Sequence, residues 1–258
     1  MLYKSKLLAA ATCTLFALPA WASDVPQESP VTANISIVND YVFRGISRTN
    51  TFPAVQGGVD LAADNGVYVG AWGSNVSWLV DRGMATGSSL ELDAYAGIKN
   101  NFFTDFNYDF GVVRYHFPAV YTAGAVNADT DEIHGALAYL WMAAKYSYSL
   151  GNAFGVAGSR GSSYLDLSAN VPISDSGVTL GAHYGKQTYA GTVAQTLKQN
   201  GTDPSYHDWQ LSISVKVSSW ALGFAYSGTS TPNGGYYTTA QGVNMGRKAS
   251  VFSVRRTF

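Results

Sequence analysis

Apolar and polar residues alternate along most of the chain beyond residue 30. In Leu90–Lys99, for example, Leu90 and Leu92 fall on one face, whereas Glu91 and Asp93 fall on the other. Because successive side chains of a β-strand point to opposite faces, this period of two predicts strands with one apolar and one polar face. The predicted strands are Thr32–Gly45, Ala54–Ala62, Val67–Trp78, Leu90–Lys99, Phe106–Phe117, Asp131–Tyr139, Trp141–Ser149, Ser163–Ile173, Val178–Thr188, His207–Val217, Trp220–Ser227 and Lys248–Phe258.

The segments between these strands alternate in length. Connections after odd-numbered strands are long, such as Pro118–Thr130 and Tyr189–Tyr206, whereas those after even-numbered strands are short, such as Ser174–Gly177. A β-sandwich gives no reason for this parity, but outer-membrane barrels have short periplasmic turns and long extracellular loops. We therefore expect an all-β fold: a transmembrane, antiparallel, up-and-down β-barrel of 12 strands.

The last predicted strand ends on an aromatic residue, with Phe252, Val254 and Phe258 on its apolar face. A membrane barrel must pair its first and last strands, because an open edge cannot be satisfied in lipid. We expect Phe252, Val254 and Phe258 to act as the signal read by the barrel-assembly machinery. Arg256 also falls on this face, and we expect it at the periplasmic rim, where a long cationic side chain can reach the lipid headgroups.

The first 30 residues have a different pattern. Lys4 and Lys6 precede an apolar run from Leu7 to Leu18, and Ala20 and Ala22 supply the small residues that a signal peptidase reads. The apolar run is shorter than the roughly 18 residues that a membrane-spanning helix needs. We expect residues 1–22 to be a cleaved signal peptide, residues 23–30 a periplasmic lead and residues 31–258 the outer-membrane barrel.

Composition supports this class of protein. Charged residues make up 13% of the chain and aromatic residues 14%, a balance that fits a membrane barrel better than a soluble sandwich. The one cysteine, Cys13, lies in the predicted signal peptide, so a disulfide-stabilised extracellular domain is excluded. Acidic and basic residues are nearly balanced, 17 against 16, so no nucleic-acid partner is expected.

Several blocks of sequence resemble the proteobacterial TorF family of porins. The resemblance covers nearly all of the expected mature chain and is most specific in its first hundred or so residues. It implies an outer-membrane barrel with a transport role, and it brings no established substrate or site. The blocks are NDYVFRGIS (39–47), PAVQG (53–57), GVYVGAWGSNVSW (66–78), ELDAYAG (91–97) and DFGVVRY (109–115).

Charged and histidine residues on the predicted inward faces are the candidate pore lining. We expect one wall to carry residues from Glu91 to His134, Lys145 to lie near Asp166 on the far wall, and Asp40 to neighbour Asp60. Opposed acidic and basic walls can orient polar solutes in a constriction. The same charges could instead pair with one another and plug the barrel, since buried charges usually occur in pairs. The candidates are Asp40, Arg44, Asp60, Glu91, Asp93, Arg114, His116, Glu132, His134, Lys145, Asp166, Lys216 and Arg255.

We therefore expect an outer-membrane channel, or porin, that passes small polar solutes passively. The alternative is a plugged barrel with a structural or surface-interaction role. An outer-membrane lipid hydrolase is less favoured, because no G-x-S-x-G motif occurs and no histidine is expected beside an outward-facing serine. His116, Glu132 and His134 follow no recognised metal-ligand spacing. We expect no enzymatic activity, cofactor or metal, and as partners only outer-membrane lipid, the assembly machinery and a small polar solute.

Overall fold

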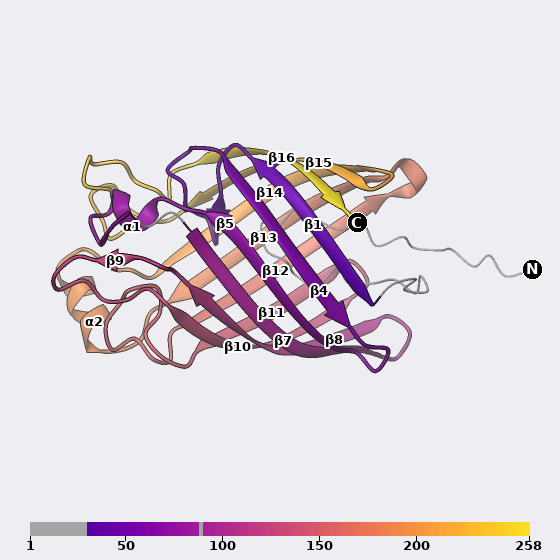
Figure 1. Ribbon diagram of the computed structural model, residues 1–258, viewed down its shortest axis with the longest axis horizontal. Helices are drawn as coiled ribbons and strands as arrows, with labels where there is room; N and C mark the ends of the chain where they lie inside the picture. Colours follow the sequence, from indigo (N-terminus) through magenta and orange to yellow (C-terminus); the bar gives the residue numbers. More distant parts are fainter. Residues whose placement is uncertain (1–29, 88–89) are drawn as a thin grey trace, which may run out of the picture.

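The computed structural model describes residues 30–87 and 90–258, and within them 12 strands form a closed antiparallel barrel (Figure 1). The predicted fold class is therefore confirmed. The expected signal peptide, residues 1–22, lies outside the described residues, as does the expected lead except for its last residue. In order around the barrel, the strands are β1 (Val31–Val38), β16 (Ala249–Thr257), β15 (Trp220–Thr229), β14 (Tyr206–Val217), β13 (Val178–Thr188), β12 (Ser163–Ile173), β11 (Met142–Ser149), β10 (Thr130–Tyr139), β8 (Phe106–His116), β7 (Leu90–Phe102), β5 (Val67–Asn75) and β4 (Ala54–Ala62).

The first and last strands close the sheet, as the sequence predicts. β1 pairs with β16 in a register that places Asn34 opposite Thr257 and Val38 opposite Ser253. The backbone N–H of Phe258 also donates to the carbonyl of Ala33, at 2.8 Å. The sheet therefore has no free edge, which is the arrangement that lipid requires.

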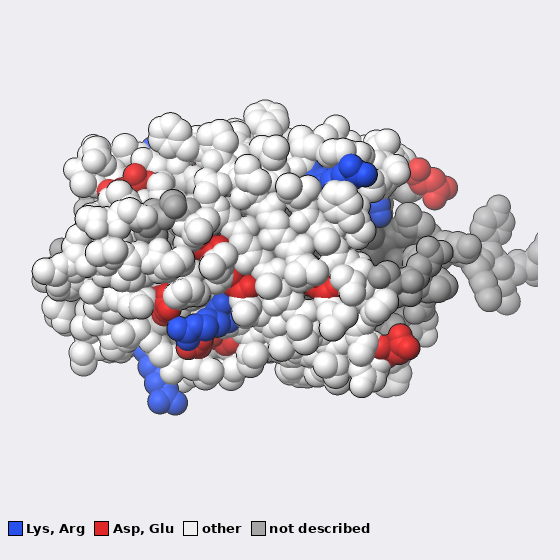
Figure 2. All heavy atoms as spheres, in the orientation of Figure 1, with Lys and Arg blue, Asp and Glu red and all other residues white. Residues whose placement is uncertain are grey.

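The outward faces of the strands form an exposed apolar surface. Ile37 on β1 is 57% exposed and Phe110 on β8 is 56% exposed, and similar side chains occur on the other strands. Figure 2 shows that the face around β1, β4 and β5 is mostly uncharged, with the charged residues in a few separate groups. Soluble monomers rarely expose so much contiguous apolar surface, whereas a barrel in lipid needs it.

The two ends of the barrel differ, as the predicted loop parity requires. At the short-turn end, near the C-terminus, the connections include the two-residue turn between β10 and β11 and the short helix η1 (Ser174–Ser176). At the opposite end, the loop end, the connections are long (Figure 1). They carry α1 (Trp78–Asp81), β6 (Ala85–Thr86), β9 (Val120–Tyr121) and α2 (Thr192–Gln199). Of the helices in the described part of the chain, none has the length and apolar character to cross a membrane.

The first strand is shorter than predicted, because the chain leaves the barrel wall after Val38. Residues 39–53, here called the inner hairpin, fold into the barrel and return to the wall at Ala54, which is paired with Val38. The inner hairpin contains the two-stranded ladder of β2 (Val42–Phe43) and β3 (Ile46–Ser47). The expected strand Thr32–Gly45 is therefore wrong beyond Val38, because its alternation continues into a second, internal hairpin.

A turn with left-handed backbone angles defines the tip of the inner hairpin. Arg44 has a φ of 46° and Gly45 a φ of 76°, the pattern of the two-residue type I′ turn whose twist matches that of paired strands. Gly45 suits this position because glycine adopts positive φ without steric cost. The turn therefore presents Arg44 at the point farthest from the base of the hairpin.

The hydrophobic core lies inside the loop-end half of the barrel. Tyr41, Phe43 and Ile46 of the inner hairpin are at most 5% exposed, and they belong to one cluster with side chains from the loops. Aromatic edge contacts join Phe43 to Phe154 at 5.4 Å between ring centroids and Phe43 to Tyr115 at 5.7 Å. The hairpin and the loops therefore pack as one unit that fills this half of the lumen.

Candidate solute site inside the barrel

The tip of the inner hairpin reaches across the lumen to the opposite wall. Arg44 donates from Nη1 and Nη2 to the carboxylate of Glu132 on β10, at 3.1 and 2.7 Å, and from Nη1 to Oε1 of Gln187 on β13, at 2.9 Å. The Arg44 and Glu132 side chains are only 5% and 1% exposed. Two parallel charge-assisted bonds of this kind fix both position and orientation. They hold the hairpin against the far wall.

Aromatic rings surround the Arg44 guanidinium, which lies 4.2 Å from the ring centroid of Tyr164 and 5.0 Å from that of Phe43. These contacts add cation–π attraction in a site from which water is largely excluded. Burial works to lower the pKa of Arg44, but the charge and hydrogen bonding of Glu132, together with Tyr115 and Tyr164, more than offset it, so this pKa is raised above its ordinary value. The guanidinium therefore stays charged where it lies, between Glu132 and the aromatic rings.

Asp40 organises the base of the hairpin. Its carboxylate accepts hydrogen bonds from Oγ of Ser47 at 2.5 Å, Oγ1 of Thr49 at 3.2 Å and the backbone N–H of Thr51 at 3.3 Å. Burial raises the pKa of Asp40, although these hydrogen bonds favour the charged form. Asp40 thus ties the two arms of the hairpin together while its own charge is poorly solvated.

Arg48, on the returning arm, is a second buried cation of the hairpin. Its guanidinium lies 4.4 Å from the ring centroid of Phe43, 4.5 Å from that of Trp78 and 5.0 Å from that of Phe154. Within residues 30–87 and 90–258, no carboxylate lies within 4.0 Å of it. Arg48 therefore joins the hairpin to the loop core through aromatic faces.

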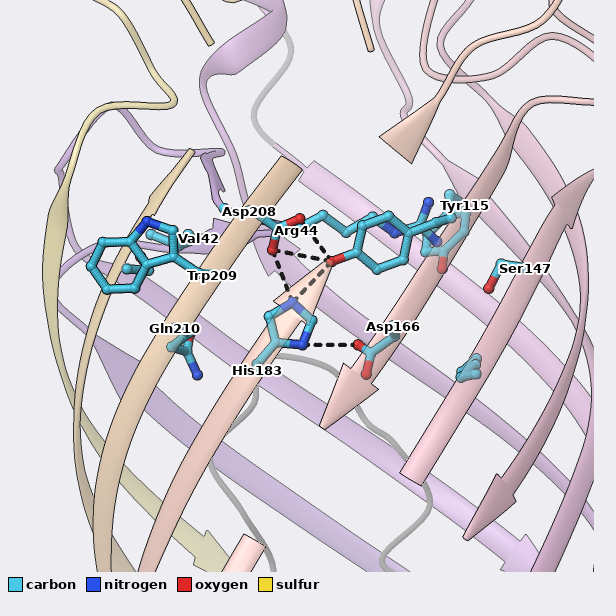
Figure 3. Close-up of a pocket in the computed structure, with 13 residues that line it drawn as sticks. Val42, Arg44, Tyr115, Ser147, Asp166, His183, Asp208, Trp209 and Gln210 are labelled. Atoms are coloured by element: carbon cyan, nitrogen blue, oxygen red, sulfur yellow. Dashed lines mark hydrogen bonds and ion pairs between the residues drawn. The ribbon is translucent and has the colours of Figure 1, made fainter. Parts of the chain in front are cut away.

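Beside the hairpin tip lies a cavity of about 650 Å³, counting the space that is open to solvent. His183 lies four positions before Gln187 on β13, so this part of the lumen is on the short-turn side of the tip. Figure 3 shows polar side chains from several strands converging there. The cavity is lined by Val42, Arg44, Gly45, Tyr115, Lys145, Ser147, Tyr164, Asp166, His183, Asp208, Trp209, Gln210 and Ser227.

His183 connects the two carboxylates of this cavity (Figure 3). Its Nε2 lies 2.9 Å from Oδ1 of Asp208, and its Nδ1 lies 3.3 Å from Oδ2 of Asp166. The hydroxyl of Tyr164 donates to the Asp208 carboxylate at 3.0 Å. Both carboxylates therefore have internal partners. Lys145 lies directly opposite Asp166 in the register of β11 and β12, which confirms that they are close.

Most of the predicted pore-lining residues do lie at inward positions. Asp60 accepts a hydrogen bond from Tyr95 at 2.6 Å. Its partner across the strands is Thr32 and not Asp40, so the expectation that Asp40 neighbours Asp60 is wrong. This expectation failed because β1 ends early, at Val38, so Asp40 lies in the inner hairpin and not in the barrel wall. The residues at inward positions of the strands are Asp60, Glu91, Asp93, Glu132, His134, Lys145, Asp166, Lys216 and Arg255.

Arg114 and His116 are corrections to the predicted lining. Between them Tyr115 is 5% exposed and packs on Phe43 inside the barrel, so the alternation turns Arg114 and His116 outward. Both are exposed and lie against Asp129, at 3.0 and 2.7 Å. The expectation that Arg114 and His116 belong to the inward wall that carries Glu91 and Glu132 is therefore wrong. The prediction placed the charged residues of this strand inward, but the hydrophobic core in the loop-end half of the barrel contains Tyr115 instead.

Some residues of the site were missed at the sequence level. Gln187 and Tyr164 are uncharged, and neither their type nor their spacing marks them as partners of an arginine. Arg48 follows Arg44 by four residues and comes directly after the block (39–47) that carries the family resemblance, and this closeness to Arg44 was its only signal. The described part of the chain contains no group of three or more histidine, cysteine, aspartate or glutamate residues placed to hold a metal ion.

Comparison with known proteins supports the fold. The model of a family described as "Bacterial protein of unknown function (Gcw_chp)" matches residues 23–258, and this match does not confirm the TorF assignment. No curated protein matches the sequence. The NanC porin structure is similar at 7% identity and a TM-score of 0.51, covering 88% of this chain and 98% of that one. The KdgM porin is similar at 8% identity and a TM-score of 0.50, with the same coverage. At these identities, the likeness shows the fold alone.

Proposed function

Since the chain belongs to the Gcw_chp family of bacterial proteins of unknown function, we propose its role from its own geometry: an outer-membrane porin that passes small polar solutes passively. The observation that carries this proposal is the contrast between the two faces of the closed barrel. The outward face is apolar, whereas the inward face carries charged and hydrogen-bonding side chains around a cavity. A lumen of this kind replaces part of the hydration shell of a polar solute. The resemblance to the TorF family implies the same role.

The inner hairpin is the gate in this proposal. It blocks the lumen between the loop end and the cavity, and its tip is fastened by Arg44 to Glu132. Val38 and Ala54 remain paired at its base, so the hairpin can leave the lumen without breaking a strand of the wall. Conduction would then require the Arg44–Glu132 pair to separate.

Targeting to the outer membrane belongs to the same proposal. Residues 1–22 would direct export, and Phe252, Val254 and Phe258 would be read by the assembly machinery. The guanidinium of Arg256 lies 4.7 Å from the ring centroid of Phe258 and 5.3 Å from that of Trp220. These rings cover the cation at the short-turn rim, which suits a residue at the level of lipid headgroups.

The packing of the hairpin favours a second candidate, a permanently plugged barrel whose loops bind a partner. Tyr41 and Phe43 are almost completely buried among loop residues, and moving them into water would expose apolar surface. A barrel in which the hairpin never moves would be a structural or surface-interaction protein.

Conductance in planar bilayers tests the two candidates against each other. The chain from residue 23 is refolded and compared with a variant in which an Asn-Gly turn joins Val38 directly to Ala54, a junction that their pairing permits. A matched control replaces residues 192–199 of the outer loop with a Gly-Ser linker. The proposal expects gated openings in the natural chain, a larger and steadier conductance in the hairpin-less variant, and no change in the control.

Two results would contradict the porin. If the hairpin-less variant folds as a barrel and neither conducts nor lets sugar-loaded liposomes swell, the lumen is not a solute path. If only this variant conducts and the natural chain stays closed at every voltage, the plugged barrel is the better description.

A further inference from the structure

The outward face of β13 and β14 changes character in three steps toward the loop end. Leu211 on β14 is 59% exposed and belongs to the apolar surface. The next outward pair toward the loop end is Tyr184 and Trp209, which lie opposite each other in the register, and the pair beyond them is Lys186 and His207. Hydrocarbon, interface and headgroups follow one another in the same order across one leaflet of a membrane. Lys186 and His207 therefore have the position of lipid headgroups.

A third basic residue, Lys248, reaches the same part of the rim across a glycine. Gly228 on β15 lies opposite Trp209, and a Cβ at Gly228 would meet Cζ2 of Trp209 at 3.2 Å and Cγ of Lys248 at 3.3 Å. The missing side chain lets the Trp209 ring and the Lys248 stem lie together over β15. Trp209 also packs edge-on against Tyr226, at 5.6 Å between ring centroids. The Lys248 chain is thus directed toward β14, which carries His207.

The ring of His207 is held in a fixed orientation. The hydroxyl of Tyr184 lies 2.6 Å from its Nδ1, and the two rings stack with their centroids 5.7 Å apart. The backbone N–H of His207 donates to Oγ of Ser230 at 2.9 Å. An imidazole fixed in this way can offer its other ring nitrogen, Nε2, to a ligand at little further cost in conformational entropy.

The charge of Lys186, His207 and Lys248, here called the basic rim, is not balanced by acidic side chains. Within residues 30–87 and 90–258, no carboxylate lies within 4.0 Å of any of the three. Asp208 follows His207 in the chain, but it points into the lumen. Asp203, in the loop before β14, lies 3.7 Å from Lys198 and is paired with it.

We propose that the basic rim binds the phosphate of a lipid headgroup. Ammonium groups bind phosphate as point charges, and each lysine near the surface of an anionic membrane adds to the attraction. The acyl chains of this lipid would lie on the apolar surface that includes Leu211, with Tyr184 and Trp209 at the level between chains and headgroup. Inorganic phosphate has no such chains, so a lipid is the expected ligand. The inference rests on the membrane placement in the proposed function and is independent of conduction.

Native mass spectrometry of the refolded protein in a neutral detergent tests this site, because it counts the bound lipids and gives their affinity by titration. The probe is lipid A, whose sugar headgroup carries phosphates, and its counterpart is the same lipid after removal of the phosphates. At about fivefold for each lysine, Lys186→Gln combined with Lys248→Gln should weaken lipid A binding about 25-fold. Loss of the phosphates should weaken binding to a similar extent. Arginine at both positions should retain most of it, and inorganic phosphate should not displace the lipid.

Arg114→Gln is the matched control and should leave lipid A binding unchanged. Arg114 is also exposed on the outward face near the loop end, but it lies five strands from β14 around the barrel and is paired with Asp129 and Asp131. Equal binding of the two lipids, undiminished binding by the double glutamine variant, or displacement by inorganic phosphate would each overturn the inference. If that variant fails to fold, the comparison of the two lipids on the natural chain decides.

Conductance of the same preparations separates this inference from the proposed function. Phosphate-dependent lipid binding without conductance would remove the porin and leave the lipid site. Conductance without phosphate-dependent binding would remove the lipid site and leave the porin.

Discussion

Glu132→Gln should release the inner hairpin, because it leaves the Arg44 guanidinium buried without a counter-charge. In the closed position, two hydrogen bonds of 3.1 and 2.7 Å join the two side chains, and both are nearly inaccessible to water. Only the bond from Arg44 to Gln187, at 2.9 Å, would remain with its geometry unchanged. The closed position loses stability, whereas an open hairpin with a hydrated Arg44 loses little.

The size of this effect follows from the burial of the pair. Removing one partner of a buried ion pair costs about 3–5 kcal/mol, and about 1.4 kcal/mol corresponds to a tenfold change in an equilibrium. The contact of Arg44 with the Tyr164 ring, at 4.2 Å, persists in the variant and opposes opening. We therefore expect the lower end of the range, a shift of about 100-fold from closed to open.

Single-channel recording in planar bilayers measures this shift as open probability. Arg44→Met combined with Glu132→Gln removes both charges and should return the open probability most of the way to the natural value, since a neutral pair carries no buried charge. Asp131→Asn is the control, because Asp131 is the outward neighbour of Glu132 and pairs with the exposed Arg114. The reasoning fails if Glu132→Gln behaves like the natural chain, or if the double variant opens as often as the single one.

Three further predictions concern the closing strand β16 and the inner hairpin. Deleting Phe258 should lower the amount of protein in the outer membrane more than it alters the conductance of refolded protein, and unchanged membrane levels would contradict the assembly role. Gly45→Val should raise the open probability, because φ is 76° and a Cβ would meet Cβ of Asp208 at 2.6 Å; strain of this kind costs about 1–3 kcal/mol. Acidification should lower the open probability. The pKa of Asp40 is raised by burial in the closed hairpin, so protonation favours closure fully below the ordinary carboxyl pKa, and this effect is lost as pH rises through the raised pKa. Asp40→Asn should abolish the pH dependence in the same recordings.

The barrel was predictable because lipid constrains it so strongly. A wall one strand thick, with lipid on one side and polar groups on the other, produces a strict period of two, and this is clear in β7 from Leu90 to Ile98. The parity of the connections and the aromatic end at Phe258 supplied the number of strands and the closing pair, which the register of Asn34 and Thr257 confirms.

The inner hairpin was not predictable in the same way. Residues 39–47 continue the alternation of β1, because a hairpin inside the barrel has two differing faces as well, so the pattern gives no sign that the chain leaves the wall at Val38. Near the loop end, the sequence pattern also did not show which face of a wall strand points into the barrel. Once the hairpin places Phe43 inside, the inward residue of β8 is Tyr115 and Arg114 turns outward. Such a reversal depends on contacts between distant segments.

The closing pair of β1 and β16 also determines the order in which this molecule can fold. Every other pairing in the barrel joins two barrel strands that are consecutive in the sequence. The pairing of β1 with β16 instead brings Asn34 to Thr257, at the other end of the barrel sequence. Until β16 arrives, β1 has an unpaired edge, and an edge of this kind is a template for aggregation. The chain would therefore need protection until its last strand docks, and ring closure should be its slowest step.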